Sequence, residues 1–247
     1  MIGRKSEVLV YNKGRGGNMK KITDMLQRKK DEKYRNFVSG LIPGIPEEKI
    51  IGVRIPEIRA IAKELVRNKD GEEFLKELPH YYYEESQLHS FMLSYIKMSF
   101  EESVAKTEEF LPFIDNWAVC DSFRPYGLKK EHEKTKLIIK KWLKSEETYT
   151  IRFALVLLLN WYLSSEEDLE FLEPASNVDS DEYYVNMAVA WYFSMALAKQ
   201  YPAAVKFLEE RKLKTEVHNL TIQKALDSRQ IGMERKDYLR SLKIDKG

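Results

Sequence analysis

A tryptophan and an aspartate stand four residues apart in the stretch IDNWAVCDSFRPYG, residues 114–127, just after an Asp-Asn pair suited to starting a helix. At that separation Trp117 and Asp121 share one face of a helix, so a partner that meets one side chain can meet the other. Aromatic faces attract cations, and a carboxylate can stabilise positive charge or activate water. Two interpretations stay open from the pattern alone. Trp117 is a core residue and Asp121 a capping or ion-paired residue, or the two side chains form a functional site.

Arg152 is the only basic residue between Lys144 and Lys199, and it lies at the start of the apolar run IRFALVLLLNWYL. An arginine in such surroundings needs an anionic partner. Asp121 could be that partner, which would make the pair structural. A phosphate could take the same place, which would make Arg152 part of a binding site.

A third group of residues lies in YYVNMAVAWYFSMAL, where Tyr184, Ala188, Trp191 and Met195 form a stripe at helical spacing. A stripe of this kind either packs into a core or presents an aromatic platform to a ligand. The pattern by itself allows both interpretations.

The elements that must position these residues are helices, because apolar residues recur with a period near 3.6 from Met19 onward. One helix is predicted over residues 19–41, and Pro56 is well placed to open the next. Further helices are predicted over residues 84–99, 102–114, 116–123, 132–145, 148–163, 180–200, 202–212 and 215–228. No stretch of the sequence calls for a sheet.

Paired helices that recur at roughly 35 to 45 residues are typical of helical-repeat proteins. We therefore predict an all-α fold, a HEAT-like helical-repeat solenoid in the form of a curved α-α superhelix, with a globular helical bundle as the alternative. Residues 19–247 are expected to form a single domain. Residues 1–18 are expected to be a flexible tail or extension, because the GRGG in this segment lacks the context of a phosphate loop.

Charge is distributed in blocks along the chain. Residues 1–70, 121–145 and 186–247 are basic overall, and the two segments between them are acidic. Such blocks are ordinarily solvated helix faces. In a superhelix they would instead give a basic concave face that holds a polyanion, with Lys140 and Lys141 among the residues expected to contact it.

Composition excludes several other classes of protein. The single cysteine, Cys120, permits no internal disulfide, and the four histidines show no metal-ligand spacing with it or with one another. The most apolar run is too short to cross a bilayer, and the sequence begins without a long apolar segment. A cytoplasmic protein without a membrane partner or an obligate protein partner is the expectation.

Taken in order, the motifs resemble the HEAT-like repeat DNA alkylation repair family, the AlkD-type alkylpurine DNA glycosylases. IGVRIPEIRAIAKEL is similar to the family's Gly-x-x-x-Pro-x-x-Arg opening, and DNWAVCDSF to its Trp-x-x-x-Asp element. IRFALVLL resembles the arginine-led helix that follows, and AVAWYFSMALAKQYP the tryptophan helix near the end. The resemblance covers most of the chain from about Lys33 to Asp227.

The resemblance implies a role for each matching residue. Trp117 and Trp191 match the tryptophans that line the DNA cleft, Asp121 the catalytic aspartate, and Arg152 an arginine that contacts phosphate near the lesion. It also implies excision of cationic N3- or N7-alkylated purines from double-stranded DNA, without base flipping and with no metal or organic cofactor.

Two positions depart from the family's pattern. Arg54 stands where well-characterised members carry a glutamine near the lesion, and Met187 stands where they carry a lysine one turn before the tryptophan. We expect Arg54 to contact phosphate or a groove. A non-catalytic HEAT-like protein for damaged or branched DNA and a protein-binding solenoid remain alternative functions.

Overall fold

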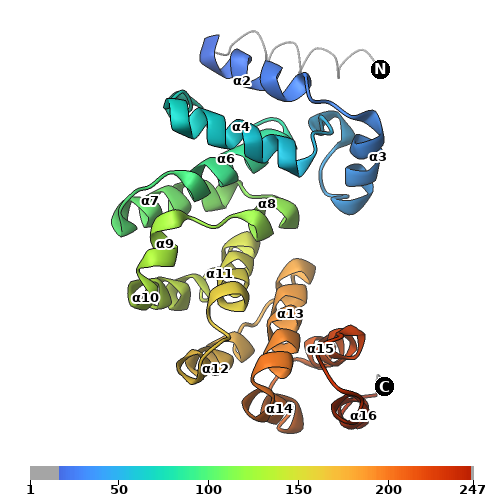
Figure 1. The fold of residues 1–247 in the computed structure, drawn as a ribbon. Helices are drawn as coiled ribbons and strands as arrows, with labels where there is room; N and C mark the ends of the chain where they lie inside the picture. Colours follow the sequence, from blue (N-terminus) through green and yellow to red (C-terminus); the bar gives the residue numbers. More distant parts are fainter. Residues whose placement is uncertain (1–16, 246–247) are drawn as a thin grey trace. The chain divides into compact units, whose positions relative to one another are not determined.

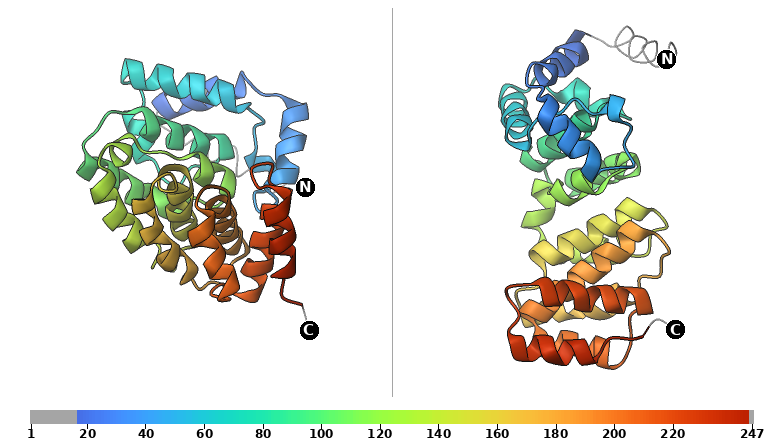
Figure 2. Two further views of the ribbon diagram at one scale, coloured as in Figure 1. Left: turned by 60° about the horizontal axis from the view of Figure 1, so that its bottom comes forward. Right: turned by 90° about the vertical axis from the view of Figure 1, so that its right-hand side faces the viewer.

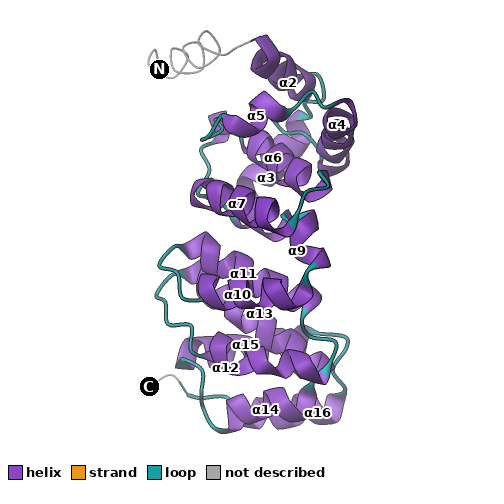
Figure 3. Cartoon of the chain, turned by 90° about the vertical axis from the view of Figure 1, so that its left-hand side faces the viewer, coloured by secondary structure: helices purple, strands orange, loops and turns teal. Residues whose placement is uncertain are grey.

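The computed structural model describes residues 17–245, and across them the chain is built from helices and the loops that join them, without a strand (Figure 3). The all-α helical-repeat fold predicted from the sequence is confirmed. In this part of the chain no helix is long and apolar enough to cross a membrane. The predicted tail lies outside the described residues up to residue 16, whereas Gly17 and Asn18 already belong to the first described helix.

The chain divides into two compact units, Met1–Glu131 and His132–Gly247. The division falls inside residues 19–247, the segment expected to be a single repeat domain. That this segment is a single domain stays a proposal. The helices described in the first unit are α2 (Gly17–Gln27), α3 (Glu32–Leu41), α4 (Ile55–Asn68), α5 (Glu72–Lys76), α6 (Tyr83–Tyr95), α7 (Phe100–Phe110), α8 (Trp117–Ser122) and α9 (Tyr126–Lys130), with 3-10 turns η1 (Glu47–Lys49) and η2 (Leu111–Phe113). Those of the second are α10 (His132–Trp142), α11 (Thr148–Trp161), α12 (Leu172–Ser176), α13 (Tyr183–Lys199), α14 (Tyr201–Glu209), α15 (Thr215–Asp227) and α16 (Met233–Ser241), with the 3-10 helix η3 (Glu166–Phe171).

Each unit is layered. In the first, α6 packs between α4 and α8, and α7 packs against α9 (Figure 1). In the second, α13 lies between α11 and α15, while α10, α12, α14 and α16 cover this row (Figures 1 and 2). Helices α6 and α11 are buried around most of their circumference, whereas α4 buries one stripe, Ile58, Ile61, Ala62 and Leu65.

The prediction of one helix over residues 19–41 is wrong, because the chain breaks between α2 and α3. Asp31 caps α3, accepting a hydrogen bond from the Tyr34 amide at 3.0 Å. Its own amide donates to the carbonyl of Gly52 at 2.9 Å, which ties the break to a distant loop. The charged run at residues 28–33 fits a helix surface by periodicity, but the cap ends that pattern.

Four of the described α-helices were not predicted: α5, α9, α12 and α16. The first three have five residues each, which is less than two turns and too short for an apolar period to be recognised. The last is mostly polar and buries a single side chain, Leu239, so it has no apolar stripe that the sequence could reveal.

His89 lies in the core of the first unit, on α6. Its side chain is 2% exposed, its ring stacks on Phe110 with centroids 4.1 Å apart, and its Nδ1 lies 2.8 Å from Nε2 of His80. Burial holds the pKa of His89 well below its ordinary value of 6.5, and the charges of His80 and Lys106 lower that pKa further. The folded protein therefore resists protonation at this position, and the unfolded chain does not.

This difference predicts a loss of stability in acid. Below about pH 6.5 the unfolded chain binds a proton at residue 89 that the folded chain does not bind, so the free energy of unfolding falls by up to about 1.4 kcal/mol per pH unit. Replacing His89→Phe keeps an aromatic ring and should flatten the dependence, as measured by urea unfolding between about pH 7.5 and 5.

Leu88→Ala on the same helix is the control for this experiment. Leu88 is fully buried, so its truncation should cost about 2–5 kcal/mol at every pH and leave the slope unchanged. If the free energy of unfolding of the His89→Phe variant depends on pH as steeply as that of the parent, His89 is not the source of the acid sensitivity.

Candidate functional site

The short helix α8 carries Trp117 and Asp121. Asn116 caps it, accepting a hydrogen bond from the Val119 amide at 3.0 Å, so the helix start predicted at the Asp-Asn pair is confirmed. Val119 and Cys120 are fully buried, whereas Trp117 and Asp121 are half-buried. The helix therefore turns one face to the core and leaves the other within reach of a ligand.

Trp117 and Asp121 both line a pocket of about 360 Å³ in the first unit. Helices α3, α4, α6 and α8 supply its walls, with Tyr34, Tyr83 and Trp117 as the aromatic rings and Asp121 as the carboxylate. The remaining lining residues are Val38, Leu41, Ile42, Ile55, Arg59, Gln87, Ala118 and Ser122.

Hydrogen bonds fix two walls of this pocket. The indole Nε1 of Trp117 donates to the carbonyl of Leu41 at 3.1 Å, which joins α8 to the end of α3. The Ser122 hydroxyl donates to Oε1 of Gln87 at 2.9 Å, and Nε2 of Gln87 donates to the Tyr83 hydroxyl at 3.1 Å. The first two bonds join α8 to α3 and to α6, and the third orients Gln87 within α6.

The charges around Asp121 are mixed. Arg124 is close enough for its pKa to respond: burial lowers the pKa of its guanidinium, the charges of Cys120 and Asp121 raise it, and Arg59 lowers it. Its Nη1 donates to the carbonyl of Phe123. Two guanidinium groups therefore accompany the carboxylate in this part of the first unit.

The loop before α4 is held by Glu84, a fully buried residue of α6. Its carboxylate accepts hydrogen bonds from the amides of Ile51, Gly52 and Val53 at 2.9, 2.6 and 3.2 Å. Burial raises the pKa of Glu84, and these three amides oppose the rise by stabilising the charged form. The loop that leads into α4 is consequently fixed to the core.

Arg54 follows this loop and is paired. Its Nε and Nη2 donate to Oδ2 of Asp31 at 3.0 and 2.9 Å, and its guanidinium lies 5.1 Å from the ring centroid of Tyr34. The side chain is 58% exposed, so this is a surface ion pair beside a pocket wall. A contact of Arg54 with DNA stays a prediction, and Asp31 is a partner that the sequence did not indicate.

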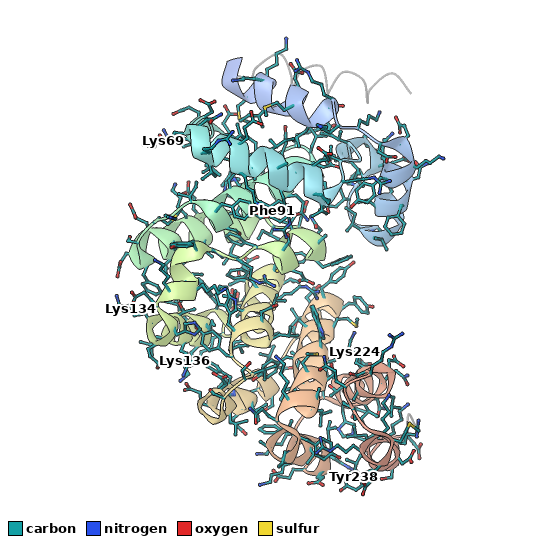
Figure 4. All side chains as sticks on the ribbon, viewed as in Figure 1. Lys69, Phe91, Lys134, Lys136, Lys224 and Tyr238 are labelled. Atoms are coloured by element: carbon teal, nitrogen blue, oxygen red, sulfur yellow. The ribbon has the colours of Figure 1, made fainter. Side chains whose placement is uncertain are left out.

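Arg152 lies on α11 in the second unit, where it is only 6% exposed. Its Nη1 donates to the carbonyl of Tyr184 at 2.8 Å, and its guanidinium lies 6.0 Å from the ring of the same residue. Lys224 of α15, labelled in Figure 4, is close enough to be affected: burial lowers its pKa, and the charge of Arg152 lowers it further. Two cations thus share this part of the unit.

Trp191 and Met187 lie on α13, on a partly exposed side of that helix that also carries Tyr184 and Met195. Ala188, the fourth member of the predicted stripe, is buried. The stripe is therefore the boundary between core and surface, and Trp191 keeps part of its surface exposed.

Lys140 lies on α10, a covering helix of the second unit. It forms an ion pair with Glu170 at 2.5 Å and lies 5.4 Å from the ring of Phe171. Lys141 is exposed on the same helix. The contact of these two lysines with the DNA backbone stays a prediction, and for Lys140 it would compete with an existing partner.

The predicted site residues fall into both units. Trp117, Asp121 and Arg54 belong to the first, and Arg152, Trp191, Lys140 and Lys141 to the second.

Sequence reasoning missed several residues that line the pocket with Asp121: Tyr34, Tyr83, Gln87 and Arg59. Only Arg59 had a signal, as the arginine that ends the Gly-x-x-x-Pro-x-x-Arg motif. Within the described residues no cluster of three or more His, Cys, Asp or Glu could hold a metal ion.

The fold and the order of these residues place the chain among all-α helical-repeat proteins. The family model described as DNA alkylation repair enzyme matches residues 19–228, and the chain belongs to this family. A role in DNA repair, with DNA as the substrate, follows from that membership. A search of the curated proteins finds no match.

Gly52 is a test of how the loop before α4 is built. Its φ is +91°, and an added Cβ would lie 2.6 Å from Cβ of Arg35 and 2.7 Å from the carbonyl oxygen of Asp31. Gly52→Ala should therefore lower the free energy of unfolding by at least about 1–3 kcal/mol. Urea unfolding measures the change.

Gly44→Ala is the matched control, because nothing lies within 4 Å of its added Cβ. This variant should be as stable as the parent or slightly more stable. Equal stability of the two variants would show that the loop adapts to a side chain at residue 52.

Proposed function

We propose that the protein is a monofunctional DNA glycosylase that hydrolyses the N-glycosidic bond of cationic N3- and N7-alkylated purines in double-stranded DNA. The observation that carries the proposal is the shared pocket of Asp121 with the rings of Tyr34, Tyr83 and Trp117. Aromatic faces and a carboxylate together suit a ligand that is flat and positively charged.

The proposed reaction follows from the charge on the base. An alkylated purine already carries a positive charge, so the bond between C1′ and the ring nitrogen breaks with its electron pair moving to the base. Positive charge then develops on the deoxyribose. The Asp121 carboxylate stabilises that charge and accepts the proton of the water that attacks C1′, leaving an abasic site and a neutral free base.

Binding in this proposal does not require the base to leave the helix. Glycosylases ordinarily flip the target base into an enclosed pocket. Trp117 and Asp121 are half-buried and reachable from the surface, which fits a lesion held against the protein. Arg152 and Trp191 are proposed to contact the phosphate and the sugar or base of the damaged strand.

Asp121→Asn tests the proposal, because the amide keeps the size of the side chain and removes its charge. The rate of 7-methylguanine or 3-methyladenine release from methylated duplex DNA should fall about 100-fold or more, about 3 kcal/mol of transition-state stabilisation, with little change in duplex affinity. Single-turnover release and equilibrium binding are measured on the same preparations.

Asp115→Asn is the control, since Asp115 is an exposed carboxylate just before α8 that does not line the pocket. It should release methylated purines at the parent rate. Release at the parent rate by Asp121→Asn would end the catalytic assignment. Duplex binding by the parent protein without any release would favour the non-catalytic alternative.

A further inference from the structure

The pocket that contains Asp121 also contains a cation, Arg59 of α4. Its guanidinium carbon lies 4.0 Å from the ring centroid of Phe91, which is fully buried on α6 and labelled in Figure 4. Its Nη1 donates to the hydroxyl of Tyr95 at 3.0 Å. These two contacts hold the planar group in place at the pocket wall.

Among the described residues, Arg59 has no carboxylate within ion-pair distance, and the bond to Tyr95 is the one hydrogen bond of its side chain. Neighbouring arginines differ: Arg35 pairs with Glu32 and Glu47, and Arg54 pairs with Asp31. A guanidinium carries five N–H donors. Most of those of Arg59 therefore have no acceptor in the described part of the chain.

The surroundings of Arg59 favour an anion. Arg124 is near enough that the Arg59 charge contributes to lowering the pKa of Arg124, after the larger effect of burial. Asp121 is the one carboxylate among the pocket-lining residues. Two guanidinium groups near one carboxylate leave an excess of positive charge.

We propose that Arg59 binds a phosphodiester oxygen of the DNA backbone next to the nucleotide that is held against the pocket. A planar guanidinium matches the geometry of a phosphate and can donate two parallel hydrogen bonds to it. The inference rests on the proposed function only in that DNA is the ligand of this pocket, and it does not require excision.

The pocket then matches both charges of one ligand. A nucleotide with an alkylated purine has a cationic base and an anionic phosphate. The aromatic rings and Asp121 suit the cationic base, and Arg59 supplies a partner for the anionic phosphate.

Arg59→Met tests this assignment, because methionine can still pack on Phe91 but carries no charge. The probe is a duplex with one tetrahydrofuran abasic analogue, which cannot be cleaved by a glycosylase, and binding is measured over a salt series. Affinity should fall about tenfold at low salt, and the slope of log K against log salt should become shallower by about 0.9. Arg59→Lys should restore most of the slope.

Lys63→Met is the control on the same helix, since Lys63 is exposed, lies 5.6 Å from the ring of Tyr95 and does not line the pocket. It should change the slope much less than Arg59→Met does. Equal changes in the two variants, or a lower melting temperature of Arg59→Met with an unchanged slope, would overturn the inference.

Release of 7-methylguanine is measured in parallel to separate this inference from the proposed function. Excision by the parent protein together with an unchanged salt slope for Arg59→Met would reject the phosphate contact of Arg59 and leave the glycosylase proposal standing. A shallower slope for Arg59→Met without any excision by the parent protein would support the phosphate contact of Arg59 and reject the glycosylase proposal.

Discussion

The buried carboxylate of Glu84 is the interaction on which the rest of the first unit depends. It lies on α6, the central helix of its row, and accepts hydrogen bonds from three successive backbone amides at residues 51–53. A loop with three amide groups turned toward the core would be costly without such an acceptor. With it, the entry to α4 has one position relative to α6.

That position has consequences for the pocket. Fixing the loop sets where α4 begins, and α4 carries Ile55 and Arg59 on the pocket wall. The same loop contacts the start of α3 through the bond between Gly52 and Asp31, which places Tyr34 near the entry to α4. One buried carboxylate thus fixes the relative positions of three helices, α3, α4 and α6, around the pocket.

The second unit also contains a buried carboxylate that accepts backbone amide bonds, but it fixes only a single turn. Asp168 of η3 is 7% exposed and accepts hydrogen bonds from the amides of Ser164 and Ser165, both at 2.9 Å, which fixes the turn after α11. The central helices α11 and α13 bury mostly apolar side chains, and the buried cation Arg152 donates to the backbone carbonyl of Tyr184. A guanidinium keeps its charge when buried, so Arg152 remains a cation inside this unit.

The sequence by itself determined the helical class and the long helices, because their apolar residues repeat every 3.6 positions and their caps are local signals, as at Asn116. It also determined that Trp117 and Asp121 share a face, which follows from helix geometry alone. The break between α2 and α3 and the partners of Arg54 and Arg59 were decided only by the tertiary structure. Each depends on residues far apart in the chain, such as Asp31 with Gly52 or Arg59 with Phe91, and no local period encodes which distant groups meet.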